Sequence, residues 1–254
     1  MLWYKSWMET RWIFLIGLLV ASCAAASVVL IWPKVMGLLP LAASFDPNSD
    51  IGRKVRESAD QFATYHGYVG SQWFGKNLRQ MASLFGILLG SGGLLSQAAG
   101  GAALFTLSMP VSRTRLLATR AAAGLAELCV LTVGASLMIP LLSPAVGKGY
   151  GAGEALITSL ALWIAATVFF SLTFFLSTVF TDMWRPPLIS VGVAIGVSVA
   201  EQFIHGSSPY LIFPSSTAGY ASVGDVPWAG ILLRVVLSAA LLYGAVVNIH
   251  RRDF

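Results

Sequence analysis

The chain has 254 residues, of which 56% are hydrophobic and only 11% are charged. A soluble domain usually has roughly 25% charged residues, so this chain has too few polar side chains to cover a soluble surface. The formal net charge of +5 reflects arginines in the loops and does not indicate a nucleic-acid-binding protein. Several stretches reach the length of about 20 apolar residues that a helix needs to cross a bilayer. We therefore predict an all-α, polytopic membrane protein.

A short amphipathic helix is predicted at residues 3–11, before the first membrane span. Trp3 and Trp7 share one helical face there, and Lys5 lies opposite, a pattern typical of a helix that lies in the membrane interface. The first span follows at residues 12–32. It has no charged residue and carries a tryptophan at each end, as the aromatic belt of a membrane helix predicts.

Residues 34–79 form the longest polar segment, and we predict that it holds a surface helix on the outer face of the membrane. The residues at 48–50 (NSD) favour a helix start. Apolar residues recur behind that start at helical spacing, namely Ile51, Val55, Ala59 and Phe62. The alternative, a disordered loop, is disfavoured by the aromatic residues of the segment, which are Phe62, Tyr65, Tyr68, Trp73 and Phe74.

Residues 70–77 (GSQWFGKN) nearly match a phosphate-binding P-loop. That motif requires Ser or Thr at the position of Asn77, and a glycine-flexible loop after a strand. Trp73 and Phe74 would crowd such a loop, and a membrane span follows directly. The sequence therefore predicts no nucleotide site in this chain.

Five further spans are predicted, at about residues 80–97, 116–142, 155–180, 188–205 and 229–249. With the first span they make six, so both termini lie on one side of the membrane. The predicted inner segments hold eight Lys and Arg residues, whereas the long outer segment holds six and the short outer loops hold one. The positive-inside rule therefore predicts cytoplasmic termini.

A connecting segment at about residues 97–115 joins the second and third spans on the inner side. Pro110 ends any helix before it, because proline disfavours a helical conformation of the preceding residue, and Ser112 can cap the next helix. Three arginines follow within eight positions, at Arg113, Arg115 and Arg120. We expect a short surface helix here, which a soluble motor protein could push.

The run from residue 92 to residue 113 (GGLLSQAAGGAALFTLSMPVSR) is similar to a stretch of the type-2 permease subunits of ATP-binding-cassette (ABC) exporters. After its second span that family carries a Gly-Thr-Leu, a few apolar residues and Pro-Val-Ser-Arg. The amphipathic N-terminus resembles the family's elbow helix, and residues 251–253 (RRD) resemble the ending after its last span. Together with six spans, the whole chain resembles the membrane subunit of such an exporter.

One departure from the family lies just before this Pro-Val-Ser-Arg. Family members often carry an acidic residue shortly before the Gly-Thr, whereas residues 97–100 (QAAG) stand there in this chain. Ala102 replaces the threonine. The segment is less polar than usual, which bears on its detailed contacts with a motor subunit and not on the fold.

The resemblance implies an assembly in the plasma membrane, the inner membrane of a bacterium. Two copies of this chain would pair among the lipids, and two cytoplasmic ABC ATPase subunits would bind below them. ATP and Mg²⁺ would bind the ATPase chains, so this chain is expected to be no enzyme, with no cofactor, metal or nucleic acid of its own. The residues expected to couple it to the ATPase are Gly100, Gly101, Leu104, Phe105, Pro110, Ser112, Arg113 and Arg115.

Pairs of glycines indicate where helices approach closely. Gly86 and Gly90 lie in the second predicted span, and Gly192 and Gly196 lie in the fifth; this spacing lets helix backbones come together. For any one of these pairs, packing inside one subunit is the favoured explanation. The family's dimer contact usually involves spans one and five, so Gly192 and Gly196 are the candidate dimer contact.

Three charged residues lie inside the predicted spans, namely Glu127, Glu201 and Arg234. Buried charges also suit an ion-coupled secondary transporter, which would need no ATPase, although the sequence shows no internal repeat. An unpaired charge at such depth costs about 2.5–3.5 kcal/mol, so Arg234 should find a partner. Depth favours Glu201, and Glu127 remains possible if spans three and six are neighbours. Arg234 and its acidic partner would either hold an outer gate closed or have a purely structural role.

Overall fold

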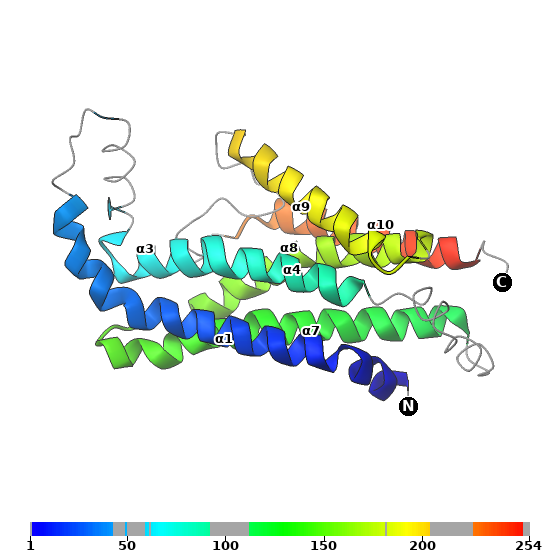
Figure 1. The fold of residues 1–254 in the computed structure, drawn as a ribbon, viewed down its shortest axis with the longest axis horizontal. Coiled ribbons are helices and arrows are strands. Elements are labelled where there is room, and N and C mark those ends of the chain that lie inside the picture. The colour runs from blue at the N-terminus through cyan, green and yellow to red at the C-terminus, as the bar shows by residue number, and fades with distance from the viewer. Residues whose placement is uncertain are drawn as a thin grey trace.

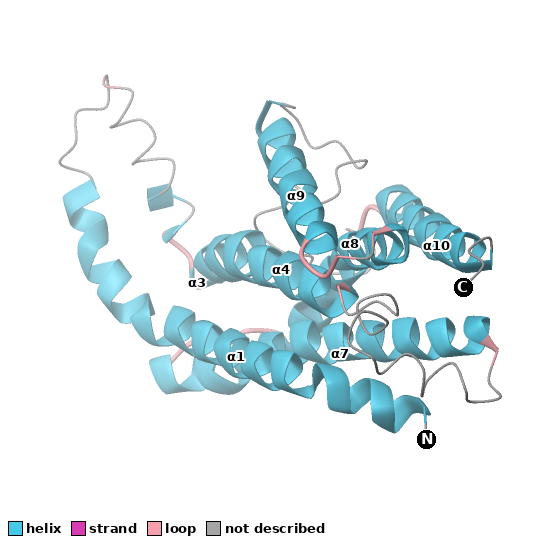
Figure 2. Ribbon diagram, turned by 45° about the vertical axis from the view of Figure 1, so that its right-hand side comes forward, coloured by secondary structure: helices cyan, strands magenta, loops and turns pink. Residues whose placement is uncertain are grey.

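The computed structural model of the protein describes residues 2–42, 49, 59–60, 62–91, 112–180, 182–203 and 226–250 (Figure 1). Its elements are α1 (Leu2–Ala42), α3 (Tyr65–Val69), the π-helix η1 (Gly70–Leu78), α4 (Arg79–Gly90), α7 (Arg113–Leu142), the 3₁₀ turn η2 (Ser143–Val146), α8 (Ala152–Val179), α9 (Arg185–Phe203) and α10 (Trp228–His250). Figure 2 shows helices and loops and no strand in this part of the chain. The predicted all-α class is confirmed.

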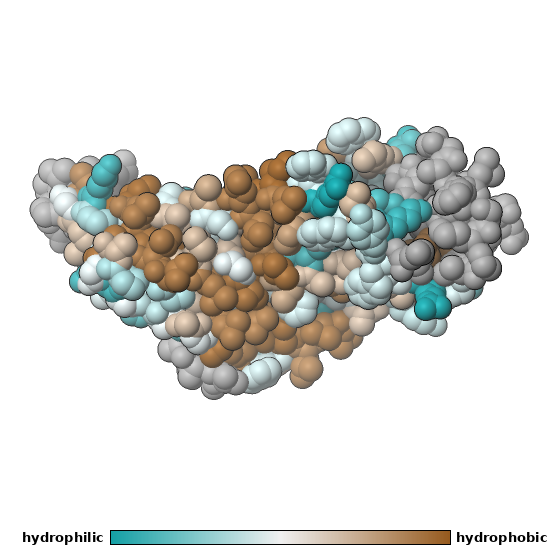
Figure 3. Space-filling view, turned by 90° about the horizontal axis from the view of Figure 1, so that it is seen from below, coloured by the Kyte–Doolittle hydropathy of each residue, from teal (hydrophilic) through white to brown (hydrophobic). Residues whose placement is uncertain are grey.

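Four of these helices are long and apolar enough to cross a membrane. They cover Trp3–Leu38, Thr114–Val146, Ala152–Val179 and Trp228–His250. Large apolar side chains are exposed along α1 and α7, for example Leu19 and Leu141. Figure 3 shows the resulting apolar band across the middle of the face that these helices form, with hydrophilic groups gathered toward the end where α1 begins. The composition and the fold together are those of a helical membrane protein.

The predicted separate helix at residues 3–11 is wrong in one respect, because α1 runs without interruption from Leu2 to Ala42. No helix-breaking residue occurs where the amphipathic segment, ending at Arg11, meets the span, beginning at Trp12, so the helix continues from one into the other. Its aromatic face is exposed as expected, whereas Ser6 and Thr10 on the other face are buried. The helix bends along its length (Figure 1), and it contains Pro33, a residue that kinks helices.

The second predicted span begins earlier than expected. Residues 65–90 form one helical run, in which the π-helix η1 joins α3 to α4, so the P-loop-like stretch at residues 70–77 is helical. The prediction of a surface helix fails for the second half of the 34–79 segment, because its aromatic side chains are buried. The predicted helix start at residues 48–50 and most of the apolar residues behind it lie outside the described residues.

The burial of this aromatic run has a visible cause in its contacts with α1 and α7. The Trp32 ring of α1 lies 5.3 Å from the Tyr65 ring and 5.1 Å from the Tyr68 ring. Trp73 is fully buried, and its indole nitrogen donates a hydrogen bond of 3.2 Å to the Ser136 hydroxyl of α7. Aromatic pairs and satisfied indole donors stabilise a buried position far better than a surface one.

Helix α8 lies at the centre of the fold, with α4, α7, α9 and α10 packed around it and α1 packed on α7 (Figure 1). Glycines let two of these neighbours approach it closely. A Cβ atom at Gly90 of α4 would lie 2.6 Å from the backbone oxygen of Phe170, and one at Gly124 of α7 would lie 2.6 Å from the Phe170 ring. A Cβ atom at Gly86 would lie 3.1 Å from the backbone oxygen of Ala166. Gly86 and Gly90 therefore serve packing within the chain.

Four helix ends lie together at one end of the molecule. Figure 1 shows the start of α1, the end of α4, the start of α7 and the end of α10 at the same side. The loop between α7 and α8 lies at the opposite side. The end of α4 and the start of α7 therefore lie at the end of the molecule where α1 begins and α10 ends.

Replacing Gly90 with alanine should lower the stability of the protein. Its new methyl group would lie 2.6 Å from a backbone oxygen of α8, and overpacking of this kind typically costs about 1–3 kcal/mol. The measurement is thermal unfolding in detergent, followed by helical circular dichroism. Gly37→Ala in α1 is the matched control, because its Cβ would meet nothing within 4 Å and alanine favours helix over glycine. Equal melting temperatures for the two variants would contradict the close packing of α4 on α8.

Candidate functional site

The predicted coupling segment is only partly described. Gly100, Gly101, Leu104, Phe105 and Pro110 lie outside the described residues. The segment's last residues are seen at the start of α7, where Ser112 is extended and its hydroxyl accepts a hydrogen bond from the backbone N–H of Arg115 at 3.4 Å. The prediction that Ser112 caps this helix is confirmed, and Arg113 is the first residue of the helix.

The arginines that follow this cap face different surroundings. Arg115 is exposed, so its guanidinium can reach a lipid phosphate or a partner protein. Arg120 turns toward α1, where its guanidinium lies 3.2 Å from the carboxylate of Glu9. Arg115 and Arg120 are close in the sequence, but the rotation along α7 turns Arg115 outward and Arg120 toward α1.

Glu127 lies two helical turns beyond Arg120 on α7 and is buried, with 6% of its surface exposed. The Thr10 hydroxyl of α1 donates a hydrogen bond of 2.6 Å to its Oε1 atom. Its other oxygen, Oε2, is buried and has no hydrogen-bond partner within the part of the chain that the structure describes. A buried carboxylate oxygen left in this state costs free energy, which marks Glu127 as a position of interest.

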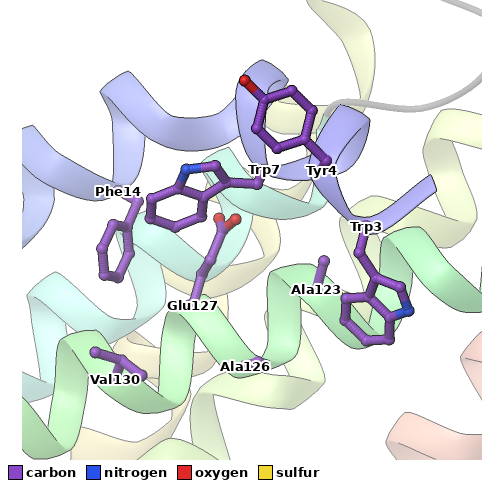
Figure 4. A pocket seen from close by; sticks show the side chains of 8 residues that line it. All are labelled: Trp3, Tyr4, Trp7, Phe14, Ala123, Ala126, Glu127 and Val130. Atoms are coloured by element: carbon purple, nitrogen blue, oxygen red, sulfur yellow. The ribbon is translucent and has the colours of Figure 1, made fainter. Parts of the chain in front are cut away.

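A pocket of about 410 Å³ opens between the start of α1 and α7, and Glu127 lines it. Figure 4 shows the Glu127 side chain rising from α7 toward α1, with its carboxylate beside the Trp7 ring. The remaining lining is apolar and consists of Trp3, Tyr4, Trp7, Phe14, Ala123, Ala126 and Val130. One charged group thus lies in an aromatic and aliphatic surround, an arrangement typical of ligand sites.

Glu201 at the end of α9 contacts a residue that the sequence analysis did not name. Its Oε2 atom lies 2.6 Å from the Nη2 atom of Arg79 at the start of α4. Depth along the helices matched the Glu201 carboxylate with Arg234, whereas the structure places it beside Arg79. A groove of about 310 Å³ runs from Arg79 between α4 and α9, so this ion pair closes one end of the space between these two helices.

Arg234 is buried in α10, with 2% of its surface exposed, so it does not face lipid. Its helix packs on α8, where the Ser238 and Thr167 hydroxyls lie 3.0 Å apart and Asn248 donates a hydrogen bond of 2.8 Å to the backbone oxygen of Thr178. Glu127 lies instead beside Thr10 of α1. The three predicted intramembrane charges thus lie at different contacts between helices.

A further polar cluster lies at the opposite end of the molecule and was missed in the sequence. Tyr150 donates a hydrogen bond of 3.1 Å to Glu154, and His66 lies 3.6 Å from the same carboxylate and stacks on the Tyr150 ring at 4.9 Å. The Tyr65 and Ser143 hydroxyls lie 2.7 Å apart beside them. Burial, reinforced by the nearby Glu154 charge, raises the pKa of Tyr150 far above its ordinary value, so its hydroxyl remains a donor. The spacing of Tyr150 and Glu154 at the start of α8 is the signal that could have indicated it.

The two candidate glycines of α9 lie on an open face. A Cβ atom at Gly192 or Gly196 would meet nothing within 4 Å in the described structure. The apolar residues Val193 and Ile195 between them are exposed as well. Metal ligands are not gathered anywhere in the described residues, since no group of three or more His, Cys, Asp and Glu residues could hold an ion there.

Breaking the contact between Arg79 and Glu201 should destabilise the protein. The two side chains are 25% and 9% exposed, so Arg79→Gln or Glu201→Gln leaves a partly buried charge without this partner. We expect a coupling free energy of about 1–3 kcal/mol in a double-mutant cycle measured by unfolding in detergent. The exposed pair of Asp182 and Arg185 is the control and should give less than about 1 kcal/mol. Additive effects of the two substitutions would contradict a stabilising pair.

Comparisons with protein-family models, with curated proteins and with solved structures find no match to this chain. No similar protein therefore supplies a function for these sites. The observations that bear on function are the capped start of α7, the half-satisfied Glu127 in its pocket and the open glycine face of α9.

Proposed function

We propose that this chain is the transmembrane permease subunit of an ABC exporter, which forms the substrate pathway as a dimer and is driven by separate cytoplasmic ATPase subunits. The observation that carries the proposal is the start of α7. The chain enters this helix through a serine cap at the end of the Pro-Val-Ser-Arg motif, at the end of the molecule where α1 begins and α10 ends (Figure 1). A motor subunit that binds from the side of the termini would meet the start of this helix.

Six membrane crossings with cytoplasmic termini belong to the same proposal. Beyond the four helices that are long and apolar enough, residues 65–90 and α9 supply two more helical runs. Their lengths at the α-helical rise are about 39 and 28 Å, close to the bilayer core of about 30 Å. Arg115 and Arg120 lie at the end where α1 begins, and the positive-inside rule favours the cytoplasm for that end. A bacterial plasma membrane is the proposed location.

The exposed face of α9 supports the proposal that two copies of the chain form a dimer. Gly192 and Gly196 have open space where a side chain would begin, and Ile189, Val193 and Val199 on the same helix are exposed. Within a membrane, small residues of this spacing let a second helix approach closely, and van der Waals packing then drives association. A second copy of the chain would supply that helix and complete a pathway between the two subunits.

An ion-coupled secondary transporter is the second candidate, and the buried charges favour it. The Arg79–Glu201 contact and the buried Glu127 carboxylate lie within helical runs of membrane length, where ionisable residues often mark ion pathways. Reconstitution separates the two functions. An exporter subunit should transport only when an ATPase chain and ATP are present, whereas a secondary transporter should respond to an ion gradient in liposomes that contain this chain alone.

Cysteines placed on α9 should form crosslinks between subunits. In a background with Cys23→Ser and Cys129→Ala, we expect Gly192→Cys and Gly196→Cys to give disulfide-linked dimers in membranes after mild oxidation, because both positions are open. Leu141→Cys, an exposed position on α7, is the control and should remain monomeric on gels. Crosslinking at Leu141 with none at either α9 position would place the dimer contact elsewhere.

A charge in the connecting segment should weaken binding of the ATPase. Leu104→Asp and Phe105→Asp replace apolar side chains that would pack against the motor subunit, and burying an unpaired carboxylate there is unfavourable. The measurement is the amount of ATPase that remains bound during purification in detergent. Lys148→Asp, in the loop between α7 and α8 at the other end of the molecule, is the control and should retain it. Unchanged binding in both variants would exclude this segment as the docking site.

A further inference from the structure

The pocket between α1 and α7 has the form of a small ligand site that is open at the membrane face. Its volume is about 410 Å³, within the usual range for small-molecule pockets. Four lining residues come from one face of α7, at the spacing of successive helical turns, namely Ala123, Ala126, Glu127 and Val130. The opposite wall is aromatic and comes from the start of α1 (Figure 4).

The one charged group in this lining has a hydrogen bond to only one of its two carboxylate oxygens. Glu127 is 94% buried, and Thr10 satisfies only its Oε1 atom. The Oε2 atom has no hydrogen-bond partner among the residues that the structure describes. In the close-up view the carboxylate points from α7 toward the α1 side of the pocket, beside Trp7 (Figure 4). A ligand with an N–H or O–H donor would complete its hydrogen bonds.

Neighbouring charges favour a cationic donor over a neutral one. Arg120, two helical turns before Glu127 on the same face of α7, lies 3.2 Å from the carboxylate of Glu9 and interacts electrostatically with both Glu9 and Glu127. The guanidinium of Arg11 lies over the Trp12 ring at 5.5 Å and donates to the sulfur of Met8. Oε2 of Glu127 has no N–H or O–H donor among the described residues, so a cation from outside the chain can supply one, and opposite charges interact strongly in surroundings of low dielectric constant.

The rest of the pocket suits the remainder of such a ligand. The rings of Trp3, Tyr4 and Trp7 can stabilise an ammonium group through cation–π contacts, and the aliphatic lining of α7 can accept an alkyl chain. Glu127 is seven residues beyond Arg120, about 10 Å along the helix. This depth matches the level at which the head group of an amphiphile meets its acyl chain.

We propose that this pocket binds an amphiphile with a primary ammonium head group, whose N–H donates to Oε2 of Glu127. The head group lies among the three aromatic rings of α1, and the apolar tail follows Ala126 and Val130 along α7. The ligand's source is either a membrane lipid with an aminoethyl head group or a free long-chain amine. Binding is independent of an ATPase, so its test stands apart from the proposed transport function.

The test uses the purified full-length chain in neutral maltoside micelles and a dodecane-1,12-diamine that carries one dansyl group. Energy transfer from tryptophan to dansyl reports binding. We expect saturable binding that unlabelled dodecylamine displaces, and at least tenfold weaker binding of the same probe with its free amine acetylated, since hydrogen bonds to charged groups are the strong ones. Equal binding of the amine and its acetylated form would overturn the proposal.

Two variants test whether the probe binds in this pocket. Glu127→Gln should weaken binding at least tenfold, whereas Asp182→Asn, which removes an exposed carboxylate in the turn between α8 and α9, should not change it. Ala126→Phe keeps Glu127 but fills the pocket from an exposed position, and it should also abolish binding. This variant decides the matter if Glu127→Gln does not fold. Wild-type binding by a folded Glu127→Gln or by Ala126→Phe would refute the site.

Competition then distinguishes the two sources of the amine. Displacement of the probe by lysophosphatidylethanolamine, and not by lysophosphatidylcholine, identifies a lipid head group. Displacement by dodecylamine alone identifies a free amine. If the choline lipid displaces the probe as well as the ethanolamine lipid does, the pocket does not select for an N–H donor and the proposal is wrong.

Discussion

The close approach of α4 and α7 to α8 is the contact on which the rest of the fold depends. Phe170 lies where Gly90 of α4 and Gly124 of α7 leave room, and a single methyl group at either glycine would come within 2.6 Å of it. Helices in a bilayer gain little from hydrophobic burial and associate largely through such packing. Within an apolar window of 18 residues in each of the four membrane-length helices, α8 has the largest buried share, 67%, against 28% for α10 and 33% for α1. The other helices are therefore arranged around it.

Buried charged side chains need a partner, and most of the charges at the helix contacts have one. Glu9 with Arg120, and Arg79 with Glu201, each join two helices that are distant in the sequence. Glu127 is different, because a neutral hydroxyl satisfies one oxygen and the other has no hydrogen-bond partner in the described structure. Ionisable residues inside a membrane often mark functional sites, and the pocket proposed to bind an amphiphile lies beside this one.

The peripheral helices leave apolar surface exposed on two sides. The α9 face around Gly192 and Gly196 is open, and the pocket lies between the start of α1 and α7. A dimer contact and an amphiphile site would thus occupy different surfaces of one subunit. The cluster of Tyr150, His66 and Glu154 joins α3 to the start of α8, at the end of the bundle away from the start of α1 (Figure 1).

The sequence by itself determined the class of the protein and several helix bounds. Runs of apolar residues without charge predict membrane helices, and α7, α8 and α10 begin and end within about three residues of the predicted spans because caps, prolines and glycines act locally. Tertiary structure decided the rest. The aromatic run of residues 65–78 is polar enough on average to predict a surface helix, yet it is buried because Trp32 and Ser136, distant in sequence, supply its ring and hydrogen-bond contacts. The partner of Glu201 could not be read from depth along a helix, since depth says nothing of which helices are neighbours; packing of α9 beside α4 brings it to Arg79.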